Sequence, residues 1–169
     1  MTARRLAALD VYVLEDNAQT RRLICTVLRT LGVGNVRESG EGNLALAEIR
    51  QKVPDIIFSD WEMQPMGGAE FVRTLRHESR GDAAKTPVIV LSAHTSLVVI
   101  KEALDAGANQ FLAKPVVPGK LLERIAFVLN DRRQLVLKDG HYVFAAPASA
   151  AGDAVPTVRG IGKEAWEVD

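Results

Sequence analysis

The 169-residue sequence predicts an α/β fold in which helices cover both faces of an open parallel sheet. Two observations support this fold class. Five short apolar runs recur over the first 130 residues, and each is followed by a segment whose apolar residues have helical spacing. A chain that alternates strand and helix in this way builds a parallel sheet from right-handed crossover units.

The expected strands are short and mostly apolar. The first, third and fourth are apolar nearly throughout, which is typical of strands buried on both faces of a parallel sheet. The five strands are expected at Val11–Leu14, Asn35–Ser39, Asp55–Ser59, Pro87–Leu91 and Gln110–Ala113.

Helical periodicity separates these strands. After the first strand, apolar residues recur at the i, i+3, i+4 and i+7 positions that line one face of a helix: Ile24, Val27, Leu28 and Leu31. Four further helices are expected around Leu44–Ile49, Phe71–Leu75, Ile100–Leu104 and Leu122–Leu129.

The pattern changes after residue 130. Leu135–Leu137 and Tyr142–Phe144 flank Lys138-Asp-Gly-His141, in which Asp-Gly signals a tight hairpin turn. The following residues have the composition of a linker and a polar tail. We therefore expect a domain at residues 9–130, a β-hairpin extension at 131–146 and a flexible tail at 147–169.

Composition and charge limit the classes of function. Lysine plus arginine number 21 and aspartate plus glutamate number 21, so no overall field concentrates nucleic acid or an anionic membrane. Cys25 is the only cysteine, which excludes an internal disulfide and fits a reducing cytoplasm. No apolar run suits a signal peptide or a membrane span. We therefore expect a cytoplasmic protein that does not insert into a membrane. We also expect no nucleic-acid binding, because the 39 residues from 131 to 169, with five basic and six acidic side chains, cannot readily form a DNA-binding output domain.

Polar side chains stand where successive strands end. Carboxyl ends of neighbouring parallel strands meet at one edge of a sheet, which is where α/β folds bind ligands. Three crowded carboxylates repel one another and need a divalent cation, and an all-oxygen set suits Mg²⁺. The residues expected to converge are Glu15 and Asp16 after the first strand, Asp60 after the third, Ser92 after the fourth and Lys114 after the fifth.

Each of these groups has a chemical task in phosphoryl transfer. Asp60 lies centrally, and a carboxylate that attacks phosphorus forms an acyl phosphate. Lys114 would supply a compact ammonium to a phosphate oxygen, and Ser92 would donate a hydroxyl hydrogen bond. The sequence thus predicts an Mg²⁺-dependent phosphoryl acceptor.

These motifs resemble the receiver domain of bacterial two-component response regulators. The resemblance covers about residues 9 to 130 and is carried by Glu15-Asp16, Ser59-Asp60-Trp-Glu-Met63 leading to Met66-Gly67-Gly68, Ser92-Ala93 and Lys114-Pro115. It implies a flavodoxin-like (βα)5 three-layer sandwich with strand order 2-1-3-4-5.

The resemblance also implies roles and partners. Asp60 would receive a phosphoryl group from a histidine kinase or a histidine phosphotransfer protein, and Ser92 and Lys114 would contact that group. A downstream protein would then bind the face that phosphorylation has changed. The implied Mg²⁺ ligands are Glu15, Asp16, Asp60 and the backbone carbonyl of Met63.

Some positions depart from the family pattern or have two interpretations. Gln64 stands where the family usually has proline, and Pro65 follows, so a variant loop path is expected. Phe111 has the position of the family's rotating switch aromatic, although an ordinary core phenylalanine is the alternative. Glu62 and His94 have positions that tune dephosphorylation in the family, although solvated loop residues are the alternative.

The helix expected from about Ser96 to Ala106 begins with four consecutive apolar residues, Leu97 to Ile100. A helix buries only one face, so part of this run should remain exposed. With the strand at residues 110–113 and the last helix, it forms a candidate surface for a downstream target or for a homodimer. The alternative is that these residues cover the sheet in the ordinary way.

Other residues give no sign of a second site. His77 and His141 stand apart from each other and from any acid pair with metal-ligand spacing, so surface or loop positions are expected for both. The glycines that flank the second strand do not form a dinucleotide-binding fingerprint.

We therefore expect a response regulator that works as a phosphorylation switch through protein contacts, without turnover of a small-molecule substrate. Two alternatives remain open. One is a pseudo-receiver scaffold that is not phosphorylated. The other is an Mg²⁺-dependent phosphohydrolase, which is disfavoured because those enzymes place an Asp-x-Asp pair on the first strand, whereas Asp60-Trp-Glu62 follows the third.

Overall fold

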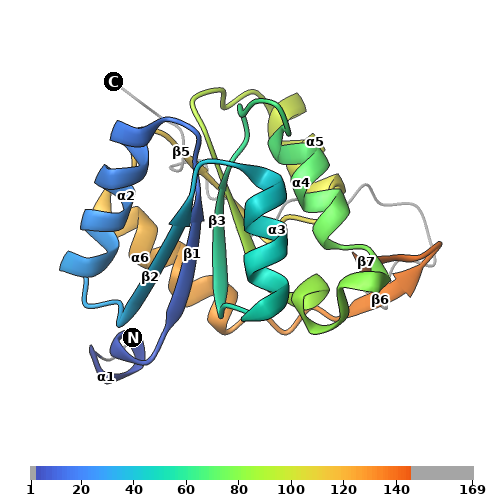
Figure 1. Cartoon of the computed structure of the whole chain (residues 1–169), viewed down its shortest axis with the longest axis horizontal. Helices are drawn as coiled ribbons and strands as arrows, with labels where there is room; N and C mark the ends of the chain where they lie inside the picture. Colours follow the sequence, from blue (N-terminus) through green and yellow to red (C-terminus); the bar gives the residue numbers. More distant parts are fainter. Residues whose placement is uncertain (1–2, 146–169) are drawn as a thin grey trace.

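The computed structural model describes residues 3–145, which form a three-layer α/β sandwich (Figure 1). Its central layer is a five-stranded sheet in which every neighbouring pair is parallel, in the order β2-β1-β3-β4-β5. The predicted flavodoxin-like fold class is therefore confirmed. The strands are β1 Asp10–Leu14, β2 Asn35–Ser39, β3 Ile56–Asp60, β4 Val88–Ser92 and β5 Gln110–Ala113.

Helices cover both faces of this sheet. Two of them pack on one face and three on the other, as the two hydrophobic clusters show. The first pair is α2 Ala18–Thr30 and α6 Pro118–Leu129, and the other three are α3 Gly42–Gln51, α4 Gly68–Leu75 and α5 Leu97–Asp105.

Local signals fix where several helices begin. Asn17 precedes α2, and its side-chain oxygen accepts two backbone N–H groups of the first turn at 3.0 and 2.9 Å. Ser96 caps α5 by accepting the N–H of Val99 at 3.3 Å. Pro118 opens α6, where the missing N–H costs no helical hydrogen bond.

The core lies on both sides of the sheet. β3 and β4 are buried at every position, so their side chains alternate between two apolar clusters. Each large apolar side chain buried there stabilises the fold by about 1.5–3 kcal/mol.

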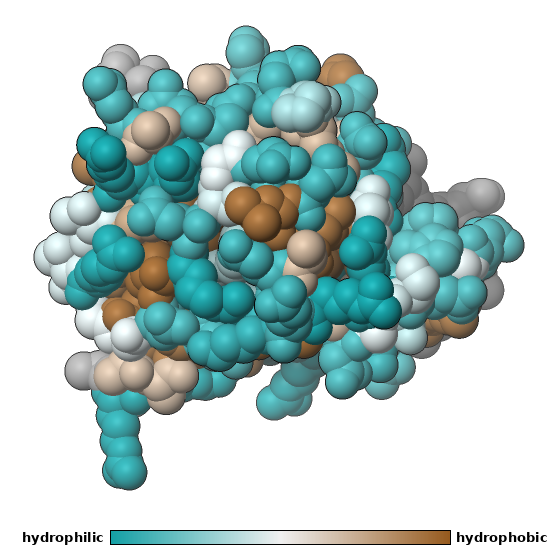
Figure 2. Space-filling view, in the orientation of Figure 1, coloured by the Kyte–Doolittle hydropathy of each residue, from teal (hydrophilic) through white to brown (hydrophobic). Residues whose placement is uncertain are grey.

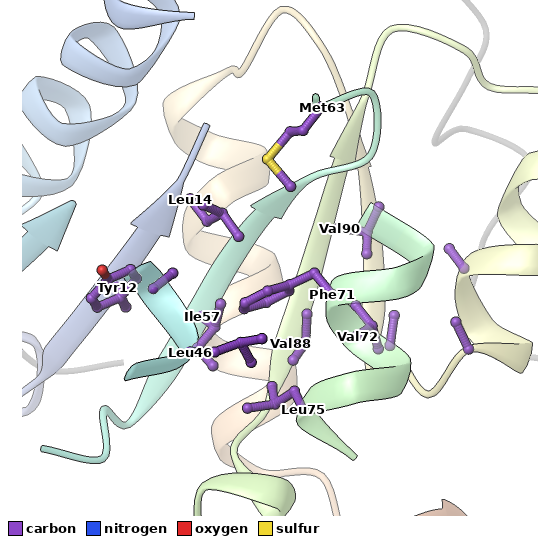
Figure 3. Packing of buried hydrophobic residues seen from close by; sticks show 14 of the residues in the cluster. Tyr12, Leu14, Leu46, Ile57, Met63, Phe71, Val72, Leu75, Val88 and Val90 are labelled. Carbon is purple, nitrogen blue, oxygen red and sulfur yellow. The ribbon is translucent and has the colours of Figure 1, made fainter. Parts of the chain in front are cut away.

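Figure 2 shows that hydrophilic residues cover most of one face of the molecule, with small separate hydrophobic patches. In one cluster (Figure 3), the sheet contributes Leu14, Ile57 and Val90, and the helices contribute Leu46, Phe71 and Leu75.

Two short elements were not expected from the sequence. α1, Ala3–Ala7, precedes β1, and Leu6 of α1 and Leu9 after it are buried in the apolar cluster on the sheet face that α2 and α6 cover. Gly34 permits this, because a Cβ there would lie 1.9 Å from the carbonyl oxygen of Ala7. A 3₁₀ helix at Glu78–Lys85 joins α4 to β4.

A hairpin follows α6, formed by β6, Leu135–Lys138, and β7, His141–Phe144. Its two turn residues, Asp139 and Gly140, have φ values of 50° and 78°, as the tightest hairpin turns require. The tail expected at residues 147–169, and residue 146 of the expected extension, lie outside the described residues.

The hairpin is joined to the sandwich through the backbone that follows α4 (Figure 1). Tyr142 N–H donates to the carbonyl of Arg76 at 2.8 Å, and Glu78 N–H donates to the carbonyl of Gly140 at 2.8 Å. The expectation that His77 and His141 stand apart was wrong. Their rings meet edge to face with centroids 4.9 Å apart, because the two residues form a β-bridge.

Among residues 3–145, no helix is both long enough and apolar enough to cross a membrane.

Candidate functional site

The predicted polar residues meet at the carboxyl edge of the sheet. Parallel pairing aligns Leu14 with Ser59 and Asp60 with Leu91, so neighbouring strands end at the same level. β3 and β4 each run one residue further than expected. Asp60 and Ser92 are therefore the last residues of their strands, while Glu15, Asp16 and Lys114 stand in the loops just after theirs.

Three carboxylates form an acidic cluster at this edge. Glu15, Asp16 and Asp60 each offer a carboxylate oxygen, and these atoms lie within 4.8 Å of one another. Glu15 is 1% exposed and Asp60 is 2% exposed, whereas Asp16 faces solvent. Burying an unpaired carboxylate costs several kcal/mol, so these two groups need a positive partner.

Lys114 provides that partner. Its Nζ lies 2.6 Å from Glu15 Oε2 and 2.8 Å from Asp60 Oδ1. Burial lowers the pKa of the Lys114 ammonium, but the hydrogen bonds to Asp60 and Glu15 outweigh burial and raise the pKa above its ordinary value. Burial raises the pKa of Glu15, and the Asp60 charge adds to this while Lys114 opposes it.

The donor set fits a divalent cation. Three carboxylates against one ammonium leave negative charge uncompensated within the cluster. All the ligand atoms are oxygens, and the exposed side of Asp16 leaves room for the water ligands that Mg²⁺ retains. Glu15, Asp16 and Asp60 are thus able to hold Mg²⁺.

Backbone contacts hold Glu15 in place. Its N–H donates to the carbonyl of Ser39 in β2 at 3.1 Å, and its Oε1 accepts the N–H of Asn17 at 3.2 Å. Sequence reasoning missed Arg21, whose Nη1 donates to the Glu15 carbonyl at 2.7 Å. One arginine on a helix has no sequence signal for this contact beyond its position one turn after Asn17.

The loop after β3 bonds to the acidic cluster through main-chain N–H groups. Gln64 N–H donates to Asp16 Oδ2 at 3.2 Å. A proline at this position has no N–H, so the departure from the family pattern adds a bond to the cluster. The Met63 side chain is buried in the core (Figure 3), and the role of its carbonyl stays a prediction.

Gly68 lets this loop lie close to β3. A Cβ on Gly68 would come within 2.5 Å of the Asp60 carbonyl oxygen and 2.7 Å of Trp61 Cα, which are backbone atoms that cannot move aside. The Gly68 N–H donates to the Trp61 carbonyl at 3.0 Å. The glycine after Met66-Gly67 therefore fixes the start of α4 against the end of β3.

Ser92 belongs to a hydrogen-bonded group with Glu62 and His94. Its hydroxyl donates to Glu62 Oε1 at 2.5 Å and accepts the His94 N–H at 2.9 Å. The ring Nδ1 of His94 lies 2.9 Å from the same Glu62 oxygen. Burial raises the pKa of Glu62, but the hydrogen bonds from Ser92 and His94 outweigh it and lower the pKa. Glu62 thus accepts the Ser92 hydroxyl and bonds to His94 although its side chain is 38% exposed, and its role in dephosphorylation stays a prediction.

Phe111 and the exposed part of α5 lie beside this site. Phe111 is buried in β5 and shares a cluster with Ile100 and Ala103 of α5. Leu97 is 75% exposed and Val98 is 66% exposed, so the apolar start of α5 is buried only in part, as expected. The switch role of Phe111 stays a prediction.

Comparisons with known proteins point to one family. The sequence model of the response regulator receiver domain matches residues 11–126. The chain is 31% identical over 117 residues to the chemotaxis protein CheY of Pseudomonas aeruginosa, covering 69% of this chain and 93% of that protein. It is 35% identical over 133 residues to the transcriptional activator protein ExaE of Pseudomonas putida, covering 79% of this chain and 60% of that protein.

A solved structure agrees with these sequence matches. Chemotaxis protein CheY4 of Vibrio cholerae superposes with a TM-score of 0.65 at 31% identity, covering 71% of this chain and 98% of that chain. The range matched by the family includes every polar residue of the carboxyl edge.

Proposed function

This chain belongs to the response regulator receiver domain family, and on that premise we propose that Asp60 accepts a phosphoryl group. The donor would be the phosphohistidine of a histidine kinase or of a histidine phosphotransfer protein. The observation that carries the proposal is the position of Asp60, whose buried carboxylate shares Lys114 with Glu15 and lies within the acidic cluster.

Each side chain of the site has a separate role in the phosphoryl transfer. One Asp60 carboxylate oxygen attacks phosphorus, so an O–P bond forms while the P–N bond of the phosphohistidine breaks and its electron pair returns to the imidazole. Lys114 Nζ lies 2.8 Å from Asp60 Oδ1 before the transfer, and it would then form an ion pair with an oxygen of the incoming phosphoryl group. Glu15, Asp16 and Asp60 would hold Mg²⁺, which when bound neutralises charge on the transferring group.

The phosphorylated protein would change the conformation of one face of the molecule. The acyl phosphate carries about two negative charges in place of the single charge of the Asp60 carboxylate, and its strong acceptors give the Ser92 hydroxyl a new partner. Movement of the loop after β4 would let the Phe111 ring, which is already buried against Ile100 and Ala103, change its rotamer. We propose that the face formed by α5, β5 and α6 then binds a downstream protein or a second copy of this chain, and that the exposed Leu97 and Val98 are part of it.

Glu62 and His94 each stand two residues after the last residue of a strand, Asp60 in β3 and Ser92 in β4. Their side chains are joined at 2.9 Å, and we propose that together they limit the approach of the water that hydrolyses the acyl phosphate. Turnover of a small-molecule substrate is not part of this function.

Phosphorylation by acetyl phosphate tests the proposal. With Mg²⁺ present, the intact protein should gain one phosphate-sized mass, and Asp60→Asn should gain none because an amide does not attack phosphorus. The matched control is Asp82→Asn, which changes an exposed aspartate and should leave the adduct intact. A wild-type protein without an adduct would favour the pseudo-receiver scaffold, and rapid turnover of many phosphoesters would favour the phosphohydrolase.

A further inference from the structure

Glu62 connects the phosphoacceptor to the switch hydroxyl. Its backbone N–H donates to Asp60 Oδ1 at 3.3 Å, while its carboxylate accepts the Ser92 hydroxyl at 2.5 Å. Ser92 is fully buried, whereas the Glu62 side chain is 38% exposed. A surface carboxylate therefore reaches inward to bind a buried hydroxyl beside Asp60.

The Ser92 proton has more than one acceptor within reach. A hydroxyl has only one proton to donate. The Oγ atom lies 2.5 Å from Glu62 Oε1 and 3.1 Å from the His94 carbonyl, and the charged oxygen at the shorter distance is the stronger acceptor. While Glu62 accepts this proton, it is not available to a phosphoryl oxygen on Asp60.

We propose that Glu62 is a positioning residue whose carboxylate holds the Ser92 hydroxyl away from Asp60. We call this hydrogen bond the latch, and the release of Ser92 from it is a step of the switch. The inference rests on the proposed function of Asp60. It goes beyond an effect on phosphoryl lifetime, because the latch sets how readily Ser92 turns to the phosphoryl group in the first place.

Electrostatic repulsion between the acyl phosphate and the Glu62 carboxylate would release the Ser92 hydroxyl. Phosphorylation replaces the single charge of Asp60, which accepts the Glu62 N–H, with about two charges on the acyl phosphate, and like charges repel. The Glu62 carboxylate then leaves Ser92, and the hydroxyl proton transfers its hydrogen bond to a phosphoryl oxygen. The His94 ring, 74% exposed and bonded to the same Glu62 oxygen, is able to follow that carboxylate, so the two side chains stay joined.

A double-mutant cycle on the affinity for beryllofluoride with Mg²⁺ tests the latch. Glu62→Met should tighten beryllofluoride binding about tenfold when Ser92 is present, because no bond to Glu62 has to break. In a Ser92→Ala background the same change should tighten binding only about twofold, which is the effect of charge alone. Glu62→Gln is equally neutral but keeps an acceptor, so it should give an intermediate value.

Controls separate the latch from folding and from the proposed function. Glu70→Gln removes an exposed carboxylate from α4 and should not change the affinity, and thermal unfolding without ligand checks that each variant is folded. Equal tightening in both backgrounds, or none in either, overturns the latch. A wild-type protein that does not bind beryllofluoride overturns the proposed function as well, whereas binding without coupling overturns the latch alone.

Discussion

Replacing Lys114 by methionine should tighten Mg²⁺ binding about tenfold and slow phosphorylation by acetyl phosphate about a hundredfold. The affinity should rise because, in the wild-type protein, Lys114 Nζ pairs with Glu15 at 2.6 Å and with Asp60 at 2.8 Å. An incoming Mg²⁺ ion must therefore compete with the ammonium for both carboxylates. The rate should fall because the variant lacks the ammonium that binds an oxygen of the transferring group, even with Mg²⁺ bound.

The two effects have opposite signs, which separates them from simple damage to the site. Mg²⁺ affinity can be followed by the fluorescence of Trp61, next to Asp60, in a Trp166→Phe background. Lys101→Met is the matched control, because it removes an exposed ammonium that pairs with Asp105 at 2.7 Å. Weaker Mg²⁺ binding in Lys114→Met would contradict the assignment of Glu15 and Asp60 as shared ligands of the lysine and the ion.

Replacing Arg76 by methionine should lower the free energy of unfolding by about 3–5 kcal/mol, the largest stability effect that we expect. Arg76 is 1% exposed, and burial lowers its pKa to about 10, so it stays charged at neutral pH. Its guanidinium binds neutral acceptors at 2.8–3.0 Å, namely the carbonyls of Gly107, Ala84 and Thr86 and the side chain of Asn109.

Methionine fills a similar volume but leaves these buried acceptors without a donor. Urea denaturation measures the loss, and Arg73→Met is the matched control on the same helix, where the exposed side chain predicts a change within about 0.5 kcal/mol. A loss below about 1 kcal/mol for Arg76→Met would mean that the cost of burying the guanidinium cancels its hydrogen bonds.

The sheet and the carboxyl edge were predictable because their signals are local. Every strand of the sheet except β2 contains a short apolar run, and Asp60, Ser92 and Lys114 each stand where such a run ends. Parallel pairing then brings these ends together regardless of the distance along the chain. The convergence of the site therefore followed from the strand assignments alone.

Arg76 was not predictable in the same way. An arginine at the end of an amphipathic helix usually extends into solvent, and its burial depends on acceptors of two later segments, residues 84–86 and 107–109, that fold over it. The contact between His77 and His141 has the same cause. It depends on the hairpin pairing with the backbone at residues 76–78, for which the side chains give no signal.

The Glu62–Ser92 bond lies between these cases. Ser92 ends β4 and Glu62 stands just after β3, so their proximity was predictable, but the choice of Glu62 as the partner of Ser92 depends on how the loop after β3 turns. Met63 and Gly68 fix that turn by burial and by close backbone approach, and neither effect is visible in residue spacing.

Borohydride reduction of the phosphorylated protein is the most direct test of the central claim. An aspartyl phosphate is an activated carbonyl that borohydride converts to homoserine, whereas free carboxylates do not react. After treatment with acetyl phosphate and Mg²⁺, peptide mass mapping should place homoserine at position 60 alone, and chelation of the metal should abolish it. Homoserine at another position, or none with Mg²⁺ present, would contradict the account.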